Sequence, residues 1–198
     1  NKAITYTQEN KLPDTDYHMI ATDDTIYEKD YAEKILALMD ADSSLAIASG
    51  DYAGQDAHAP HGAGRFVKNS FFNKHHGLYP EKMGYESLML YSASKHGFRS
   101  LIVKDARFVH LRPLGKNHNF YQFGASMRTL GYHPFFVLGR FLKYFLTGKP
   151  TGRRGSLYML YYYLSYRPKQ ACYDSMHSEE MRKYIRKIQL QRIKDRLF

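Results

Sequence analysis

The fold is decided by the stretch YHMIATDDTIY, residues 17–27. Its first part, Tyr17 to Ala21, is a short apolar run of the kind that forms a buried strand. The run ends in Thr22-Asp23-Asp24, and an amphipathic helix is predicted to follow. The apolar residues expected on one face of that helix are Tyr31, Ile35, Leu38 and Met39. A strand, a polar turn and a helix in this order are typical of α/β proteins.

The same alternation continues to about residue 112, and the chain then becomes helical. Further strands are predicted at Leu45–Ser49, closed by Gly50, at Phe98–Val103, and at Ala106–Arg112 after a turn at Lys104-Asp105. A helix that follows Gly84 is expected to end at Gly97, because glycine is a good C-terminal cap. Later helices are predicted at Phe120–Leu130, Pro134–Leu146, Ser156–Tyr166 and about Ser178–Leu197. We therefore expect two domains, an α/β domain at 1–115 and a basic helical extension at 116–198.

The net charge of +10 is concentrated in the last third of the chain. Residues 139–198 hold 14 Lys and Arg against 4 Asp and Glu, whereas the first 138 residues are neutral. A basic tail favours an anionic surface, such as nucleic acid or phospholipid head groups. The single cysteine, Cys172, excludes an intrachain disulfide. No apolar run approaches the roughly 20 residues that cross a bilayer.

Asp23 and Asp24 are the first candidate site residues, because they follow the end of a predicted strand. Ligands of open α/β sheets bind outside the carboxyl ends of the strands. Two carboxylates there can hold a hard divalent cation such as Mg²⁺ or Mn²⁺. The alternative is that the pair caps the following helix, and the spacing alone does not separate the two interpretations.

Glu86 stands at the predicted start of a helix, where it could be a general base or could simply favour the helix dipole. His110 and Arg112 are two apart in a strand and so point to the same side. His110 could bind a metal and Arg112 a phosphate, or both could belong to the polar face of an edge strand. Asp56, His58 and His61 suggest zinc, but their spacing matches no closed zinc site, and a polar loop is the better interpretation.

Taken in order, these segments resemble the central part of family 2 glycosyltransferases with the GT-A fold. Thr22-Asp23-Asp24 is similar to the metal-binding Asp-x-Asp element of that family, with Thr in place of the first Asp. Gly62-Ala63-Gly64-Arg65 resembles a segment on the acceptor side, and Tyr85-Glu86 resembles the aromatic-acidic pair that holds the catalytic base. His110-Leu111-Arg112 resembles a closing element near the diphosphate. Leu130-Gly131-Tyr132-His133-Pro134 and the basic tail resemble a branch with a membrane-associated C-terminal extension.

The resemblance implies an inverting transfer of a sugar from a nucleotide-diphospho-sugar to an acceptor hydroxyl. It implies Mg²⁺ or Mn²⁺ on Asp24 with Asp23 beside it, Glu86 as the base in the same cleft, and Arg112 on the leaving diphosphate. For His110 it leaves open a metal ligand or a phosphate donor. The family normally begins with strands that bind the nucleotide, and these are expected to precede Asn1. The chain would then be an inactive fragment of a partial GT-A layer with an exposed sheet edge.

The tail is predicted to lie on a membrane surface without crossing it, at the cytoplasmic face, which would suit a lipid-linked or cell-surface glycan as acceptor. The residues that suggest this crowd one helix: Phe135, Phe136, Leu138, Phe141, Leu142 and Phe145. Aromatic residues beside Lys and Arg are typical of interfacial helices. The alternative is that these side chains pack on the core. The rival function is a basic module without catalysis that binds nucleic acid or a membrane interface. Because the charge lies on helices with large apolar faces, we expect no nucleic-acid partner.

Overall fold

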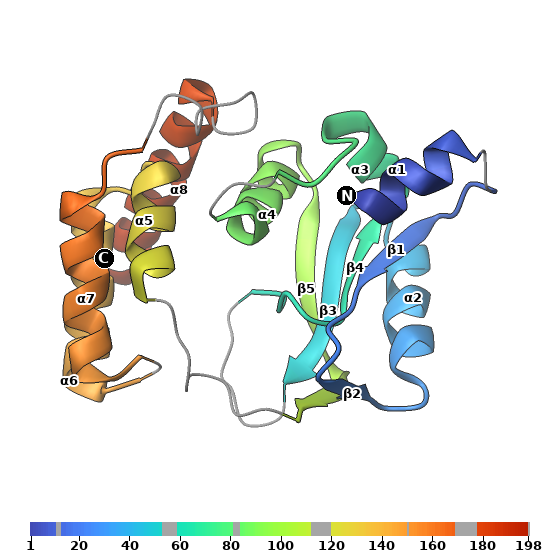
Figure 1. Ribbon diagram of the computed structural model, residues 1–198, viewed down its shortest axis with the longest axis horizontal. Coiled ribbons are helices and arrows are strands. Elements are labelled where there is room, and N and C mark those ends of the chain that lie inside the picture. Colours follow the sequence, from blue (N-terminus) through green and yellow to red (C-terminus); the bar gives the residue numbers. More distant parts are fainter. Residues whose placement is uncertain are drawn as a thin grey trace. The chain divides into compact units, whose positions relative to one another are not determined.

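The structure is a computed structural model that describes residues 1–10, 13–52, 59–80, 84–111, 120–149, 151–168 and 178–197. The chain forms two compact units (Figure 1). The first comprises Asn1–Tyr79 and Met89–Pro113, and the second comprises Pro80–Leu88 and Leu114–Phe198. The boundary expected after residue 115 thus falls after Pro113, and a second segment, at residues 80–88, also clusters with the helical unit.

A five-stranded mixed sheet is the centre of the first unit (Figure 1). Its strands are β1 (Tyr17–Ile20), β2 (Thr25–Tyr27), β3 (Leu45–Tyr52), β4 (Arg65–Lys68) and β5 (Arg99–His110). They lie in the order β1-β4-β3-β5-β2, and only β3 and β5 are parallel to each other. The expected α/β class is therefore confirmed.

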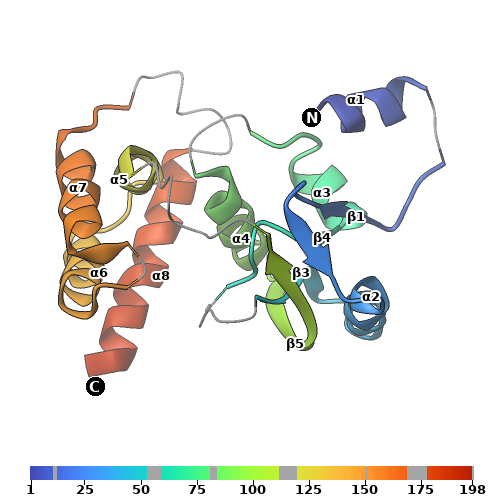
Figure 2. The same ribbon diagram turned by 60° about the horizontal axis from the view of Figure 1, so that its bottom comes forward.

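Helices cover both faces of this sheet (Figure 2). They are α1 (Lys2–Glu9), α2 (Tyr31–Ala41), α3 (Asn69–His75) and α4 (Tyr85–Lys95). Helix α2 packs on one face through Ile35 and Met39, whereas α3 and the later turns of α4 pack on the other. The prediction that Leu38 shares the buried face of α2 is wrong, because 43% of this side chain is exposed.

Tyr31 joins helix α2 to the central strands. Its hydroxyl donates to the carbonyl oxygen of Gly64 at 2.7 Å and accepts from the backbone N–H of Gly50 at 2.8 Å. Burial raises the pKa of Tyr31 to about 12, so the hydroxyl keeps its proton at neutral pH.

The predicted turn at Lys104-Asp105 does not occur, and β5 is one strand of 12 residues. The register of its pairing with β3 shifts: Gly50 lies opposite Val103, but the next residue, Asp51, lies opposite Arg107. The extra residues of β5 form an irregularity of the β-bulge kind. In the sequence, the polar residues of such an irregularity look like those of a turn. Strand β3 likewise runs through Gly50 instead of ending there. Glycine is required at this position because a side chain would collide with the Ala106 carbonyl group.

Strand β1 was expected to be buried, but all four of its residues are only partly buried. It pairs with β4 alone and lies at the edge of the sheet. Strands β2 and β4 and helix α3 were not predicted. Strand β2 has only three residues and Ile26 at its centre is exposed, so it has no continuous hydrophobic signal.

The described residues of the second unit form four further helices: α5 (Phe120–Thr129), α6 (Pro134–Thr147), α7 (Gly152–Ser165) and α8 (Glu179–Leu197). All four were expected, and Pro134 occupies the first turn of α6 as predicted. Helix α5 packs closely on α7, where a Cβ at Gly124 would lie 2.5 Å from the carbonyl oxygen of Met159.

The turn at residues 130–134 is fixed by side chains from α7 and α8. Tyr163 donates to the carbonyl oxygen of Tyr132 at 2.8 Å, and the fully buried Gln189 accepts from the backbone N–H of His133 at 2.7 Å. Gly131 has a φ of 68°, as expected for a helix-ending glycine. This segment therefore has a structural task within its own unit.

Candidate functional site

The predicted residues Asp24 and His110 lie together at one edge of the sheet. Asp23 and Asp24 occupy the turn between β1 and β2, and His110 is the last residue of β5. Strand β2 pairs with β5 so that Thr25 lies opposite His110. The backbone N–H of Leu111 also donates to the carbonyl oxygen of Asp24 at 2.7 Å. Two segments that are far apart in sequence are thus joined by main-chain contacts.

The side chains of Asp24 and His110 are in contact as well. Oδ1 of Asp24 lies 3.5 Å from Nδ1 of His110, and the exposed fractions of these side chains are 21% and 10%. The hydroxyl oxygen of Thr25 lies 3.0 Å from the same ring nitrogen. A hydrogen bond from Thr22, aided by the charge and hydrogen bond of His110, holds the pKa of Asp24 below its usual value. Asp24 is therefore an anion at neutral pH, and its turn is ordered by two threonines.

Aromatic rings hold the imidazole of His110 in place. It packs edge-on against Tyr52 at 5.1 Å and against Phe108 at 5.5 Å between ring centroids. His61 contacts the same two rings, at 6.0 and 5.4 Å. These contacts limit the movement of the imidazole ring of His110.

His61 is a neighbour of this cluster that the sequence assigned to a polar loop. Its ring is half-buried, and burial lowers its pKa. Among the residues that the structure describes, none supplies a hydrogen-bond partner for its buried Nε2 atom. Its backbone N–H donates to Ser49 at 2.9 Å. The sequence grouped His61 with Asp56 and His58 and not with His110, because its place beside Tyr52 and Phe108 depends on the pairing of β3 with β5. Asp56 and His58, considered with it, lie outside the described residues.

The other predicted site residues are Asp23, Arg112 and Glu86. Asp23 is exposed in the turn beside Asp24. Arg112 lies outside the residues that the structure describes. Glu86 is exposed in the first turn of α4, where the Tyr85 hydroxyl lies 3.5 Å from its Oε1. It belongs to the second unit, whereas Asp24 belongs to the first. The expectation that Glu86 shares a cleft with Asp24 therefore stays a prediction.

Asp24 and His110 could be two ligands of one metal ion. Ligands about 2.1–2.2 Å from a cation, at roughly a right angle or wider, lie about 3.0–3.5 Å apart, which matches the pair. Within the described ranges, no group of three or more His, Cys, Asp or Glu side chains is placed to hold a metal. A cation here would need other ligands, such as phosphate oxygens and water.

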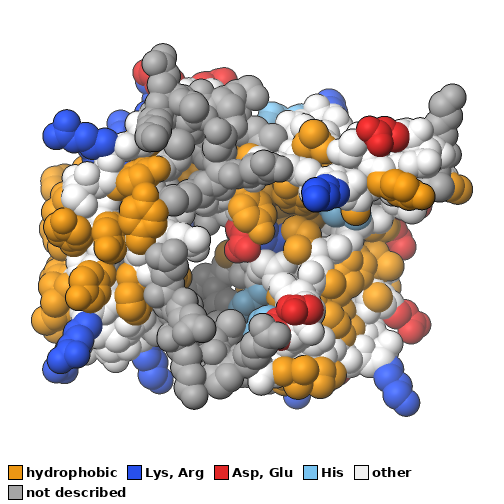
Figure 3. All heavy atoms as spheres, viewed as in Figure 1, with side chains coloured by type: hydrophobic (Ala, Val, Ile, Leu, Met, Phe, Trp, Pro, Cys, Tyr) orange, Lys and Arg blue, Asp and Glu red, His pale blue; other side chains and the backbone are white. Residues whose placement is uncertain are grey.

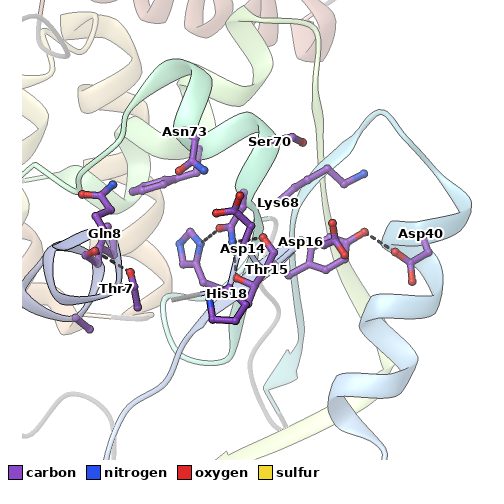
Figure 4. Close-up of a pocket in the computed structure, with 16 residues that line it drawn as sticks. Thr7, Gln8, Asp14, Thr15, Asp16, His18, Asp40, Lys68, Ser70 and Asn73 are labelled. Atoms are coloured by element: carbon purple, nitrogen blue, oxygen red, sulfur yellow. Dashed lines mark hydrogen bonds between the residues drawn. The ribbon is translucent and has the colours of Figure 1, made fainter. Parts of the chain in front are cut away.

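A separate groove of about 890 Å³ lies near the opposite end of β1, between α1, β1 and α3 (Figure 4). Asp14 and Asp16, which precede β1, line it together with Asp40 and Lys68. Asp40 accepts a hydrogen bond of 2.6 Å from Tyr17. The sequence did not mark this groove, because its carboxylates come from an irregular segment and from the end of a helix.

His18 forms part of the lining of this groove, but both of its ring nitrogens have partners. Nδ1 lies 2.5 Å from Oδ1 of Asn69, and Nε2 lies 2.7 Å from the Tyr79 hydroxyl. The Asn69 amide nitrogen faces two oxygens of Thr15, so its oxygen must accept from His18. Burial lowers the pKa of His18, and the neutral ring then accepts at Nε2 from Tyr79. His18 thus anchors β1 to α3 and has no free nitrogen for a ligand.

No family model matches the sequence, and a search of curated proteins finds no match.

Proposed function

We propose that this chain carries the metal- and diphosphate-binding part of an inverting glycosyltransferase that uses a nucleotide-diphospho-sugar. The observation that carries the proposal is the contact between Asp24 and His110 at the sheet edge. Both were chosen from the sequence as members of one site, and each belongs to a separate motif. A carboxylate beside an imidazole, at the end of strands in an α/β sheet, is a suitable place for a metal and phosphate groups.

Asp24 and His110 would hold the cation, and the exposed Asp23 would add negative charge beside it. When bound, the cation neutralises the charge that develops on the departing diphosphate. Thr22 and Thr25 keep Asp24 oriented through hydrogen bonds, which reduces the entropy lost when the site binds a ligand. Arg112, two residues after His110, is proposed to add a second positive charge to the diphosphate.

Glu86 is the proposed base on sequence grounds. It would take the proton of the acceptor hydroxyl while the acceptor oxygen bonds to the anomeric carbon of the sugar. The bond from that carbon to the phosphate oxygen breaks in the same displacement, and the nucleoside diphosphate leaves with the electron pair. The configuration at the anomeric carbon is thereby inverted. The proposed setting is the cytoplasmic face of a membrane, with a lipid-linked or cell-surface glycan as the acceptor.

Manganese titration of the chain tests the metal site directly. We expect Mn²⁺, added with inorganic pyrophosphate to supply phosphate ligands, to broaden the ring proton signals of His110 well before those of His18. His18 is a built-in control, because it lines the groove near the opposite end of β1 and has both ring nitrogens engaged, and broadening falls steeply with distance from Mn²⁺. Asp24→Asn keeps the shape of the side chain and should abolish the selective broadening. Equal broadening of the two rings, or broadening that survives in Asp24→Asn, would contradict the metal site.

A further inference from the structure

Helix α6 presents an exposed apolar stripe within the second unit. Leu138, Leu142 and Leu146 follow one another at intervals of four and lie on one helical face together with Phe135. Phe135 is 70% exposed and Leu146 73%. This stripe differs from the sequence expectation, because Phe136, Phe141 and Phe145 are partly buried.

Helix α7, which packs against α6, adds a second exposed stripe. Its members are Leu157, Tyr158, Tyr161 and Leu164, all more than half exposed. Buried residues of the same helix, Met159 and Tyr163, point into the unit instead. Figure 3 shows hydrophobic side chains gathered over α7, with Lys and Arg side chains at both ends of the patch. We call the eight exposed residues of the two stripes the α6–α7 face.

The segment of the chain that carries the α6–α7 face has charges of one sign. From Ala106 to Tyr173 the sequence contains no Asp or Glu, but it has 11 Lys and Arg. Four of these cations surround the short connection between α6 and α7, and all four are exposed: Lys143, Lys149, Arg153 and Arg154. Arg167 follows the other end of α7 and is exposed too. An apolar face with exposed cations at the α6–α7 connection and beyond the end of α7 complements a surface that is apolar inside and anionic at its boundary.

We propose that the α6–α7 face lies on the surface of an anionic phospholipid bilayer, with its leucine and tyrosine side chains at the acyl boundary. The cations at the α6–α7 connection would then contact lipid phosphates. Among the described residues, no helix is long and apolar enough to cross a membrane, so the face lies in the plane of the interface. Nucleic acid fits it less well, because five of its eight residues are leucine, which offers no stacking surface for a base.

The absence of tryptophan allows a direct test on the full chain. Leu142→Trp places one indole on the α6–α7 face, and Leu38→Trp places one on α2 at a similar exposure, 48% against 43%. With vesicles of phosphatidylcholine and phosphatidylglycerol, we expect the emission of the Leu142→Trp variant to shift to the blue and to be quenched by brominated lipid. The emission of the Leu38→Trp variant should not change. The proposal is overturned if neither variant responds, if both respond equally, or if the indole of the Leu142→Trp variant is already shielded without vesicles.

Flotation separates the lipid from the other possible occupants. Wild-type chain should float with the anionic vesicles and much less with pure phosphatidylcholine. Leu142→Ser with Leu146→Ser should reduce binding roughly tenfold or more, since two inserted side chains are lost. Arg153→Ser with Arg154→Ser should weaken binding and its salt dependence, whereas Lys187→Ser with Arg192→Ser on α8 should have little effect. If the leucine changes instead abolish a dimer seen by light scattering, or if DNA competes fully with the vesicles, the lipid assignment is wrong.

Discussion

Asp24 contacts His110 through its side chain, with 3.5 Å between Oδ1 and Nδ1, while the Asp24 main chain accepts a hydrogen bond from Leu111. Both contacts result from the pairing of β2 with β5, which places Thr25 opposite His110. The separation is that of two ligands on one cation, and it is also compatible with a histidine that only orients a carboxylate. These two roles predict different behaviour.

His110→Gln distinguishes the two roles. If His110 binds the metal, the change should weaken Mn²⁺ binding by about tenfold or more but leave Mg²⁺ binding nearly unchanged, because Mg²⁺ has little preference for imidazole. Calorimetric titration with each ion in the presence of pyrophosphate measures this. Equal losses for both ions would mean that His110 orients Asp24, and no loss for either would remove it from the site.

Asp24→Ala should abolish the proposed sugar transfer, since the negative charge proposed to hold the cation is lost. Transfer is measured as release of nucleoside diphosphate with Mn²⁺ supplied. Asp40→Ala removes a carboxylate from the opposite end of β1 and is the matched control, with activity expected to survive. Substantial transfer by Asp24→Ala in excess EDTA would rule out the metal role.

Glu86→Gln keeps the size of the side chain and removes the base. Turnover should fall by about a hundredfold or more while donor binding is retained, because only proton transfer is affected. Steady-state kinetics of the proposed transfer separate kcat from KM for the donor. A variant with normal kcat would show that Glu86 is only a residue at the start of α4.

Two glycines in helices of the second unit should respond to alanine in opposite ways. Gly124→Ala should destabilise the fold by about 1–3 kcal/mol, because its Cβ would meet the backbone of α7. Gly139→Ala should stabilise it by about 0.5–1 kcal/mol, because nothing lies within 4 Å of the added atom and alanine favours the helix. Urea unfolding measures both, and a stabilising effect of Gly124→Ala would contradict the close packing of α5 on α7.

His76 should make the first unit sensitive to acid. Burial, aided by the charges of His75 and His96, lowers its pKa from 6.5 to about 4. The folded state then binds a proton less readily than the unfolded state, so stability is full above pH 6.5 and decreases as the pH falls toward 4. His76→Phe should flatten this decrease in urea unfolding followed across that range. The exposed His96, replaced by Gln, should change it much less.

The sequence was informative where a residue acts through its neighbours in the chain. Gly97 ends α4, Gly131 follows α5 and Pro134 begins α6, as capping and turn chemistry require. The α/β class followed from short apolar runs that alternate with amphipathic helices. The sequence prediction was wrong where one local pattern is compatible with two structures. Lys104-Asp105 resembled a turn but lies in an irregular pairing of β5 with β3.

The residue types alone mark the candidates for chemistry, namely Asp23, Asp24, Glu86, His110 and Arg112, because carboxylate, imidazole and guanidinium groups are recognisable wherever they stand. The pairing of the strands brings Asp24 to His110 and places His61 beside the same aromatic rings, and residue types do not show this. Those contacts depend on the register between β2 and β5 and between β3 and β5. The three residues of β2 are too few to carry a hydrophobic pattern, so its pairing is set by main-chain hydrogen bonds that the sequence does not display.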